Sequence, residues 1–154
     1  SIIDKQLLAG SPLRGKIAIA NAKLAFEAFQ DVTSSVRFGK LQLARANYQR
    51  PLWASTSTKD PSYPDTLYID ELIGPATVNT VPPKTLEAFK DHGTASVTLT
   101  SDLDVAHQAI ADLETAGISL AQATQDLEDQ GVKAFADAFT GLLETIDERR
   151  RDAA

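Results

Sequence analysis

Residues 50–59 (RPLWASTSTK) and residues 77–81 (TVNTV) decide the fold class of this chain. Each contains a short apolar or β-branched run bounded by proline or polar residues, which is typical of a short strand. Because helical segments are expected around both runs, the alternation favours parallel strands with helical crossovers and predicts an α/β fold. Two parallel strands cannot form a sheet buried on both faces. We therefore expect the chain to hold only part of an α/β unit.

Capping residues, prolines and apolar spacing predict the helices of the first hundred residues. Ser11 is the expected cap of a long helix and Pro12 its first residue. That helix should bury one face formed by Ile19, Ala22, Phe26 and Phe29, which are spaced by three and four. Further helices are expected over residues 34–46, from Asp65 to Ile73 and from Pro83 to Gly93. Residues 94–100 are expected to form an irregular connector.

The remaining part of the chain, from Ser101, is expected to be helical. Ser119 and Gln122 have the spacing of a capping box. Two sets of apolar residues with helical spacing predict two buried faces. The first set is Leu103, Ala106, Ile110 and Leu113, and the second, which is the most regular in the chain, is Val132, Phe135, Phe139, Leu142 and Ile146.

The composition excludes several classes of protein. The chain has 154 residues, 43% of them hydrophobic, which is enough for one domain with a core. It has no cysteine, which excludes disulfide scaffolds and thiol chemistry, and its net charge of −6 argues against nucleic-acid binding. No run is apolar enough for a membrane helix and no signal peptide is recognisable, so the expected location is the cytoplasm.

The best candidate for a ligand site is the loop that follows the first strand. Ser55, Ser57 and Lys59 supply hydroxyl groups and an ammonium group there, and such groups suit a phosphate or sugar hydroxyls. In α/β folds, ligands bind in the loops beyond the carboxyl ends of strands. Residues 1–100 carry 11 basic and 9 acidic side chains and residues 101–154 carry 4 and 12, so an anion is expected on the first part. The alternative is a polar surface turn.

The other chemically interesting residues have structural interpretations. Lys23 is expected to lie on a helix face with its head in water, and Lys59 is better placed as an electrostatic ligand than as a nucleophile. His92 is expected to interact with a helix C-terminus, and His107 to be structural or solvated. Arg149–Arg151 should favour the C-terminal dipole of the last helix, with a contact patch as the alternative. No metal site is expected.

Several stretches of the chain resemble bacterial transaldolases, in particular a longer subfamily with some members fused to a phosphoglucose isomerase domain. The similar stretches are residues 11–25 (helix after the sixth barrel strand), 49–59 (QRPLWASTSTK, seventh strand and loop), 63–75 (YPDTLYIDELIGP), 77–83 (TVNTVPP), and 112–119 with 127–132 (C-terminal helices). The likeness covers nearly the whole chain and begins just past the sixth strand. It implies the C-terminal part of a (β/α)8 TIM barrel with extra C-terminal helices, the N-terminal strands being absent from this chain. Residues 1–100 would then be the barrel part, and residues 101–154 would be helices packing on it.

The resemblance also implies an activity. The family transfers a dihydroxyacetone unit between sugar phosphates (sedoheptulose 7-phosphate and glyceraldehyde 3-phosphate) in the pentose phosphate pathway. It uses a lysine Schiff base and no metal or organic cofactor. The family's nucleophile, proton-handling carboxylates and a phosphate-binding arginine lie in the first six strands. The resemblance therefore implies no catalytic residue in this chain, no activity of the chain alone, and a missing N-terminal barrel half, in the same or a separate chain, as its partner.

The family's site residues can be matched one by one only in the loop of residues 54–59, which the resemblance identifies as a phosphate loop. The Ala-Ser that ends the family's seventh strand at the substrate phosphate is matched by Ala54 and Ser55, and Ser57 and Lys59 follow where some subfamilies have an arginine. Two alternatives to a transaldolase remain open. One is a non-catalytic fragment or split subunit that serves as a structural or interaction module, and the other is an unrelated phosphate-binding α/β protein.

Overall fold

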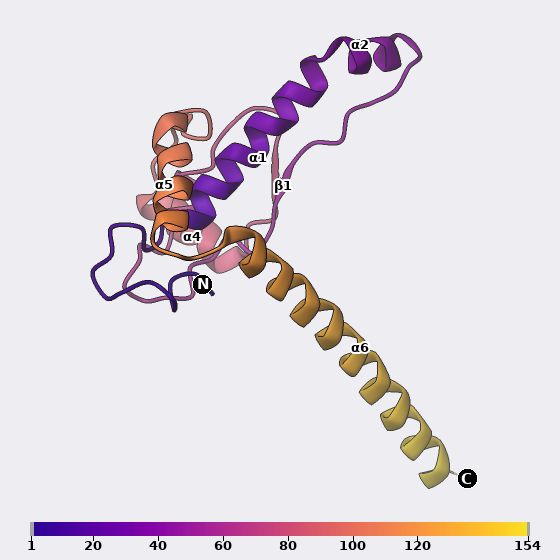
Figure 1. Ribbon diagram of the computed structural model, residues 1–154. Helices are drawn as coiled ribbons and strands as arrows, with labels where there is room; N and C mark the ends of the chain where they lie inside the picture. Colours follow the sequence, from indigo (N-terminus) through magenta and orange to yellow (C-terminus); the bar gives the residue numbers. More distant parts are fainter. Residues whose placement is uncertain (1, 154) are drawn as a thin grey trace.

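The computed structural model describes residues 2–153, which form helices and one small sheet (Figure 1). The elements in chain order are α1 (Ile17–Ser34), α2 (Val36–Leu43), β1 (Leu52–Trp53), α3 (Leu67–Asp70), β2 (Val78–Asn79), α4 (Pro83–His92), α5 (Leu103–Thr115) and α6 (Leu120–Asp152). The helices on either side of β1 and β2 agree with the predicted order, and residues 94–100 form the expected irregular connector.

The two strands form a parallel pair, as predicted, with α3 in the connection between them. Leu52 lies opposite Val78 and Trp53 opposite Asn79. The amide of Val78 donates to the carbonyl of Pro51 over 2.9 Å, which closes one end of the ladder. Within residues 2–153 each strand pairs on one side only, because the sheet has just these two strands. Both strands are shorter than the runs that predicted them.

The long helix begins at Ile17, and the predicted start at Ser11 and Pro12 is wrong. Gly15 has a φ of +74°, in the left-handed region, which interrupts an α-helix at this point. Its amide donates to Asp4 Oδ1 over 3.1 Å. The residues before Ile17 are therefore turns held by a contact with the N-terminal segment, which capping residues alone do not reveal.

Helix α1 lies between two hydrophobic clusters. One face packs against α5 through residues such as Ile17 and Ala20 on α1 and Leu113 on α5. The predicted apolar face of α1 packs toward the sheet. Its Ile19 and the nearly inaccessible Phe26 form a second cluster with Leu72 and Leu99. The partly buried side chains that pack against this cluster include Ala22, Phe29 and Trp53. The predicted set Leu103, Ala106, Ile110 and Leu113 contributes the buried Ala106 and Leu113 and the partly buried Ile110 to the first cluster.

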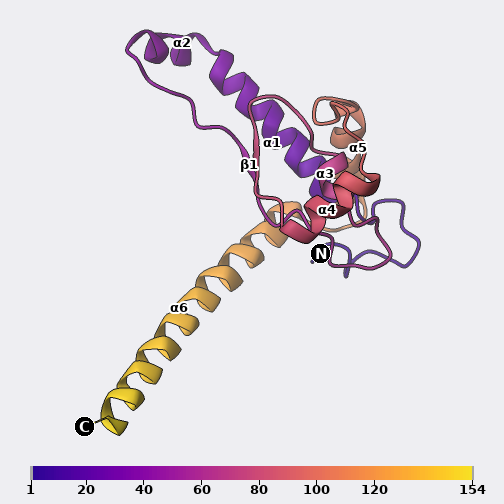
Figure 2. The ribbon, with the colours of Figure 1, turned by 180° about the vertical axis from the view of Figure 1, so that it is seen from behind.

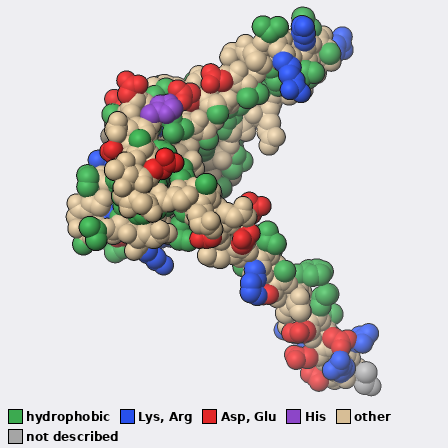
Figure 3. All heavy atoms as spheres, viewed as in Figure 1, with side chains coloured by type: hydrophobic (Ala, Val, Ile, Leu, Met, Phe, Trp, Pro, Cys, Tyr) green, Lys and Arg blue, Asp and Glu red, His purple; other side chains and the backbone are tan. Residues whose placement is uncertain are grey.

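Helix α6 projects away from the rest of the molecule (Figures 1 and 2). Its start is capped as predicted, since the Ser119 side chain accepts a hydrogen bond of 3.2 Å from the Gln122 amide. The predicted buried face is exposed instead, with Phe135 at 83%, and hydrophobic side chains are visible along α6 in Figure 3. We call this face the α6 stripe, which comprises Val132, Phe135, Phe139, Leu142 and Ile146. The spacing thus predicted the helix correctly, but nothing among residues 2–153 buries the stripe.

Two other predictions need correction. Helix α2 is shorter than residues 34–46, and its Val36 and Leu43 are exposed. The helix expected from Asp65 begins at Leu67, with Thr66 as its N-cap. Asp65 lies before it, and its Oδ1 accepts a hydrogen bond of 2.8 Å from His92 Nε2. The described part of the chain contains no helix with the length and hydropathy of a membrane span.

The contact between Asp65, which precedes α3, and His92, the last residue of α4, predicts a pH-dependent stability. Hydrogen bonds with Asp65 and then Asp91 raise the pKa of His92 above 6.5, and the bond with His92 lowers the pKa of Asp65 below 3.8. The contribution of His92 to the stability of the folded state is complete below pH 6.5 and is lost as the pH rises through its raised pKa. The contribution of Asp65 is lost as the pH falls through its lowered pKa. His92→Gln should therefore lower the Tm most between these limits, at about pH 5.5, and least at about pH 9. A pH-independent difference in Tm, measured by circular dichroism, would contradict this prediction.

Candidate functional site

The loop after β1 leaves the sheet at its carboxyl edge through a sharp change of backbone direction. Trp53 packs against the cluster around Phe26 and fixes the strand, and Ser55, two residues later, has a φ of 57°. Few residues other than glycine adopt this left-handed conformation, so surrounding contacts must hold it. The next residue, Thr56, is buried and donates through Oγ1 to Asn79 Oδ1 at the end of β2, over 2.9 Å.

The structure gathers the three predicted ligands along one cleft. Lys59 Nζ donates to Ser57 Oγ over 2.8 Å, so the ammonium group and this hydroxyl group are in direct contact. Ser55 and Lys59 are exposed and Ser57 is partly buried. All three line a cleft of about 770 Å³ and are open to a ligand from solvent.

The cleft is built from segments that are distant in the sequence. Its walls come from α1, from β1 and its loop, from α3, and from Leu127 near the start of α6. Polar residues that sequence reasoning did not single out also line it, namely Asp4, Asn21, Asp60, Tyr63 and Tyr68. Asp60 directly follows Lys59 and could have been found by proximity, but no sequence signal distinguishes Asn21 from other helix residues.

A carboxylate lies beside the cationic end of the cleft. Ser62 donates to Asp60 Oδ1 from its hydroxyl group over 2.7 Å and from its amide over 2.9 Å, and these bonds lower the pKa of Asp60 below 3.8. Asp60 is therefore ionised at neutral pH. An anion bound in this cleft would be stabilised most beside Ser55, Ser57 and Lys59, and least near the Asp60 carboxylate, which repels it.

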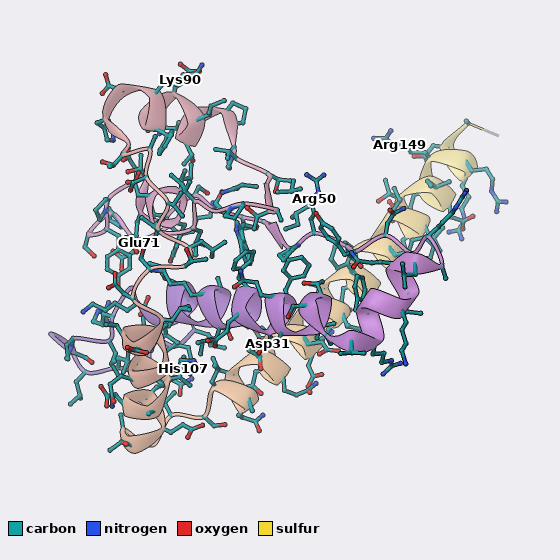
Figure 4. All side chains as sticks on the ribbon, turned by 90° about the horizontal axis from the view of Figure 1, so that it is seen from above. Asp31, Arg50, Glu71, Lys90, His107 and Arg149 are labelled. Carbon is teal, nitrogen blue, oxygen red and sulfur yellow. The ribbon has the colours of Figure 1, made fainter. Side chains whose placement is uncertain are left out.

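Lys23 does not have its head in water, which corrects the prediction. Its side chain is only 7% exposed, and Nζ lies 3.2 Å from the Ser101 carbonyl and 3.5 Å from Glu71 Oε2. Glu71 lies beside the N-terminal half of α1 in Figure 4. These two partners replace water, so Lys23 ties α1 to the segments that follow α3 and precede α5. It lines a second cleft, of about 490 Å³, between α1 and α5.

The remaining predicted residues do not line the cleft beside the loop after β1. His107 Nε2 is 2.8 Å from Glu27 Oε2, which joins α5 to α1 and agrees with a structural role. Figure 4 labels His107 on α5. Arg149–Arg151 occupy the last turn of α6, as expected. Arg150 and Arg151 both pair with Asp147 within the helix.

Comparison with known proteins identifies the family to which the chain is similar. The family model described as Transaldolase/Fructose-6-phosphate aldolase matches residues 2–146. The chain is 50% identical over 143 residues to a transaldolase of Parafrankia sp. (strain EAN1pec), a match that covers 92% of this chain and 39% of that protein. It is 47% identical to a transaldolase of Thermobifida fusca, covering 87% of this chain and 37% of the relative. It is 44% identical to a transaldolase of Renibacterium salmoninarum, covering 99% of this chain and 42% of the relative.

The chain thus spans about two fifths of the length of these relatives. The family model covers both strands, the loop after β1 and most of α6, up to Ile146, the last residue of the α6 stripe. The chain belongs to the transaldolase/fructose-6-phosphate aldolase family.

Proposed function

We propose that this chain supplies the C-terminal part of a transaldolase. The enzyme would transfer a dihydroxyacetone unit from sedoheptulose 7-phosphate to glyceraldehyde 3-phosphate, in the pentose phosphate pathway. The observation that carries the proposal is the identity of 44–50% to proteins named transaldolase over most of this chain. The lysine that forms the Schiff base would lie outside this chain, in the part of the relatives that it does not cover.

The proposed role of this chain is to bind the phosphate of the substrate. The hydroxyl groups of Ser55 and Ser57 would donate to phosphate oxygens, and Lys59 would supply a charge-assisted bond. The contact between Lys59 and Ser57 supports this role, because it places a cation and a hydroxyl donor 2.8 Å apart on one cleft. No metal or organic cofactor enters the proposed reaction.

The proposed architecture is a (β/α)8 barrel in which β1 and β2 are the seventh and eighth strands. Two features support it. Each strand has one edge without a partner among residues 2–153. Leu52 is 52% exposed, whereas Trp53, whose side chain must point to the opposite face of the strand, packs on the helix layer. In a barrel, further strands would pair with the free edges and side chains of the interior would cover Leu52.

In this architecture residues 1–100 belong to the barrel, and residues 101–154 are helices that pack on it. The α6 stripe supports this division. Soluble proteins rarely leave a continuous apolar face open to water, so the stripe is expected to have a partner. The part of the barrel that the relatives have and this chain lacks is the partner we propose.

The stripe also favours the second candidate function, a non-catalytic fragment or split subunit that acts as an interaction module. In that case the chain would bind a barrel half without completing an active site. The two functions differ in whether the assembled protein turns over sugar phosphates.

An assembly experiment tests the proposal. The chain would be co-expressed with the N-terminal part of the Parafrankia transaldolase that it does not cover, and transaldolase activity would be measured with each part alone and with both. Activity is expected only for the pair, because we propose that the imine-forming lysine lies in the added part. Borohydride reduction in the presence of fructose 6-phosphate should label the added part and leave this chain unlabelled. A stable assembly without activity would favour the interaction module, and a dihydroxyacetone adduct on Lys23 or Lys59 would contradict the proposal.

A further inference from the structure

A buried side-chain hydrogen bond joins the phosphate loop to the neighbouring strand β2. Thr56 Oγ1 donates to Asn79 Oδ1 over 2.9 Å. Thr56 is only 3% exposed, so water does not compete effectively for this bond. Asn79 is the last residue of β2 and lies opposite Trp53 in the parallel register, so the bond spans the carboxyl ends of both strands.

The position of Thr56 allows this hydrogen bond to restrain the backbone of the loop. Thr56 lies between Ser55 and Ser57, two of the three candidate phosphate ligands. The backbone of Ser55 is in the left-handed region, with a φ of 57°, and would relax toward more common conformations if the following residue were released. Holding Thr56 against Asn79 therefore fixes the direction in which both serine hydroxyl groups leave the strand.

We propose that Thr56 and Asn79 are positioning residues that hold the phosphate loop in its binding conformation. The inference rests on the proposed phosphate-binding function. Neither residue has to touch the phosphate, because their effect passes through the backbone of Ser55 and Ser57. A merely structural bond would stabilise the fold but leave the phosphate affinity of the folded protein unchanged, and this difference can be measured.

The test uses the full 154-residue chain, with inorganic phosphate as the probe. Phosphate is titrated into ¹⁵N-labelled protein, and the Kd is taken from the amide shifts of Ser55 and Ser57. Thr56→Val keeps the shape of the side chain but removes the donor, and it is expected to raise the Kd roughly 3- to 10-fold, the equivalent of one hydrogen bond. Thr56→Ser restores the hydroxyl group and should return the Kd to near the wild-type value.

Thr58→Val is the matched control. Thr58 lies in the same loop and also loses one hydrogen bond, from its Oγ1 to the Pro64 carbonyl over 3.1 Å, but it has no bond to β2. Its Kd should stay close to that of the wild type. If Thr56→Val does not fold, Asn79→Ala carries the same test, because it removes the acceptor of the same bond.

The outcomes separate this inference from the proposed function. A wild-type chain whose Ser55 and Ser57 amides do not respond to phosphate would overturn the phosphate-binding role of the loop and, with it, the positioning role. A wild-type chain that binds phosphate, together with a Thr56→Val variant that has a lower Tm and the same Kd, would overturn only the positioning role. A weakened Kd in Thr56→Val, rescued by Thr56→Ser and absent in Thr58→Val, would support it.

Discussion

Phe26→Ala is expected to lower the free energy of unfolding by about 3–5 kcal/mol, the range for truncating a buried aromatic side chain. Phe26 is 2% exposed and lies at the centre of the cluster that joins α1 to the sheet. Its ring centroid is 5.7 Å from that of Phe29. Truncation would leave a cavity in the cluster against which Trp53 packs, so β1 and the loop that follows it would lose support.

Urea denaturation, followed by circular dichroism and by Trp53 fluorescence, measures this effect. Val32→Ala is the matched control, because Val32 is on the same helix but largely exposed, and its variant should stay within about 0.5 kcal/mol of the wild type. A loss below about 1 kcal/mol for Phe26→Ala would mean that the cluster does not contribute cooperatively to the fold.

Ser55→Ala is expected to have the largest effect on substrate recognition. In the proposed transaldolase assembly it should raise the KM for sugar phosphates more than it lowers kcat, because it would remove the proposed bond to the phosphate, a group that does not react. A hydrogen bond to a charged group contributes about 1.5–3 kcal/mol, so KM should rise roughly 10- to 150-fold.

An unphosphorylated substrate is the decisive comparison for this variant. Fructose has no dianion to lose, so its turnover should change far less than that of fructose 6-phosphate. Ser96→Ala, an exposed serine in the 94–100 connector, provides a control that should leave both substrates unaffected. Equal slowing of the phosphorylated and unphosphorylated substrates would mean that Ser55 supports the loop and does not bind phosphate.

Local signals were sufficient to predict some elements of the fold. The start of α4 at Pro83 and the cap of α6 at Ser119 depend on residues within one turn of the helix end, and both predictions are confirmed. The start of α1 was missed because Gly15 is held by Asp4, eleven residues away. Lys23 was misjudged for the same reason, since its partners Glu71 and Ser101 lie far along the chain.

The candidate site was predictable in the same partial way. Ser55, Ser57 and Lys59 follow one another after a strand, so their common location could be inferred from the chain order alone. Asn21 and Leu127 reach the same cleft from α1 and α6, and no periodicity or spacing connects them to the loop. The bond from Thr56 to Asn79 likewise requires the register of two strands, which turn chemistry and composition do not determine.

The projecting α6 has a consequence for the behaviour of the isolated chain in solution. A helix of 33 residues is about 50 Å long at 1.5 Å per residue, and most of it extends beyond the folded body. Such a particle experiences more friction than a sphere of 16.5 kDa, so it diffuses more slowly and elutes earlier from a gel-filtration column. An early elution volume is therefore expected for a single copy, and light scattering, which reports mass independently of shape, is the measurement that counts its subunits.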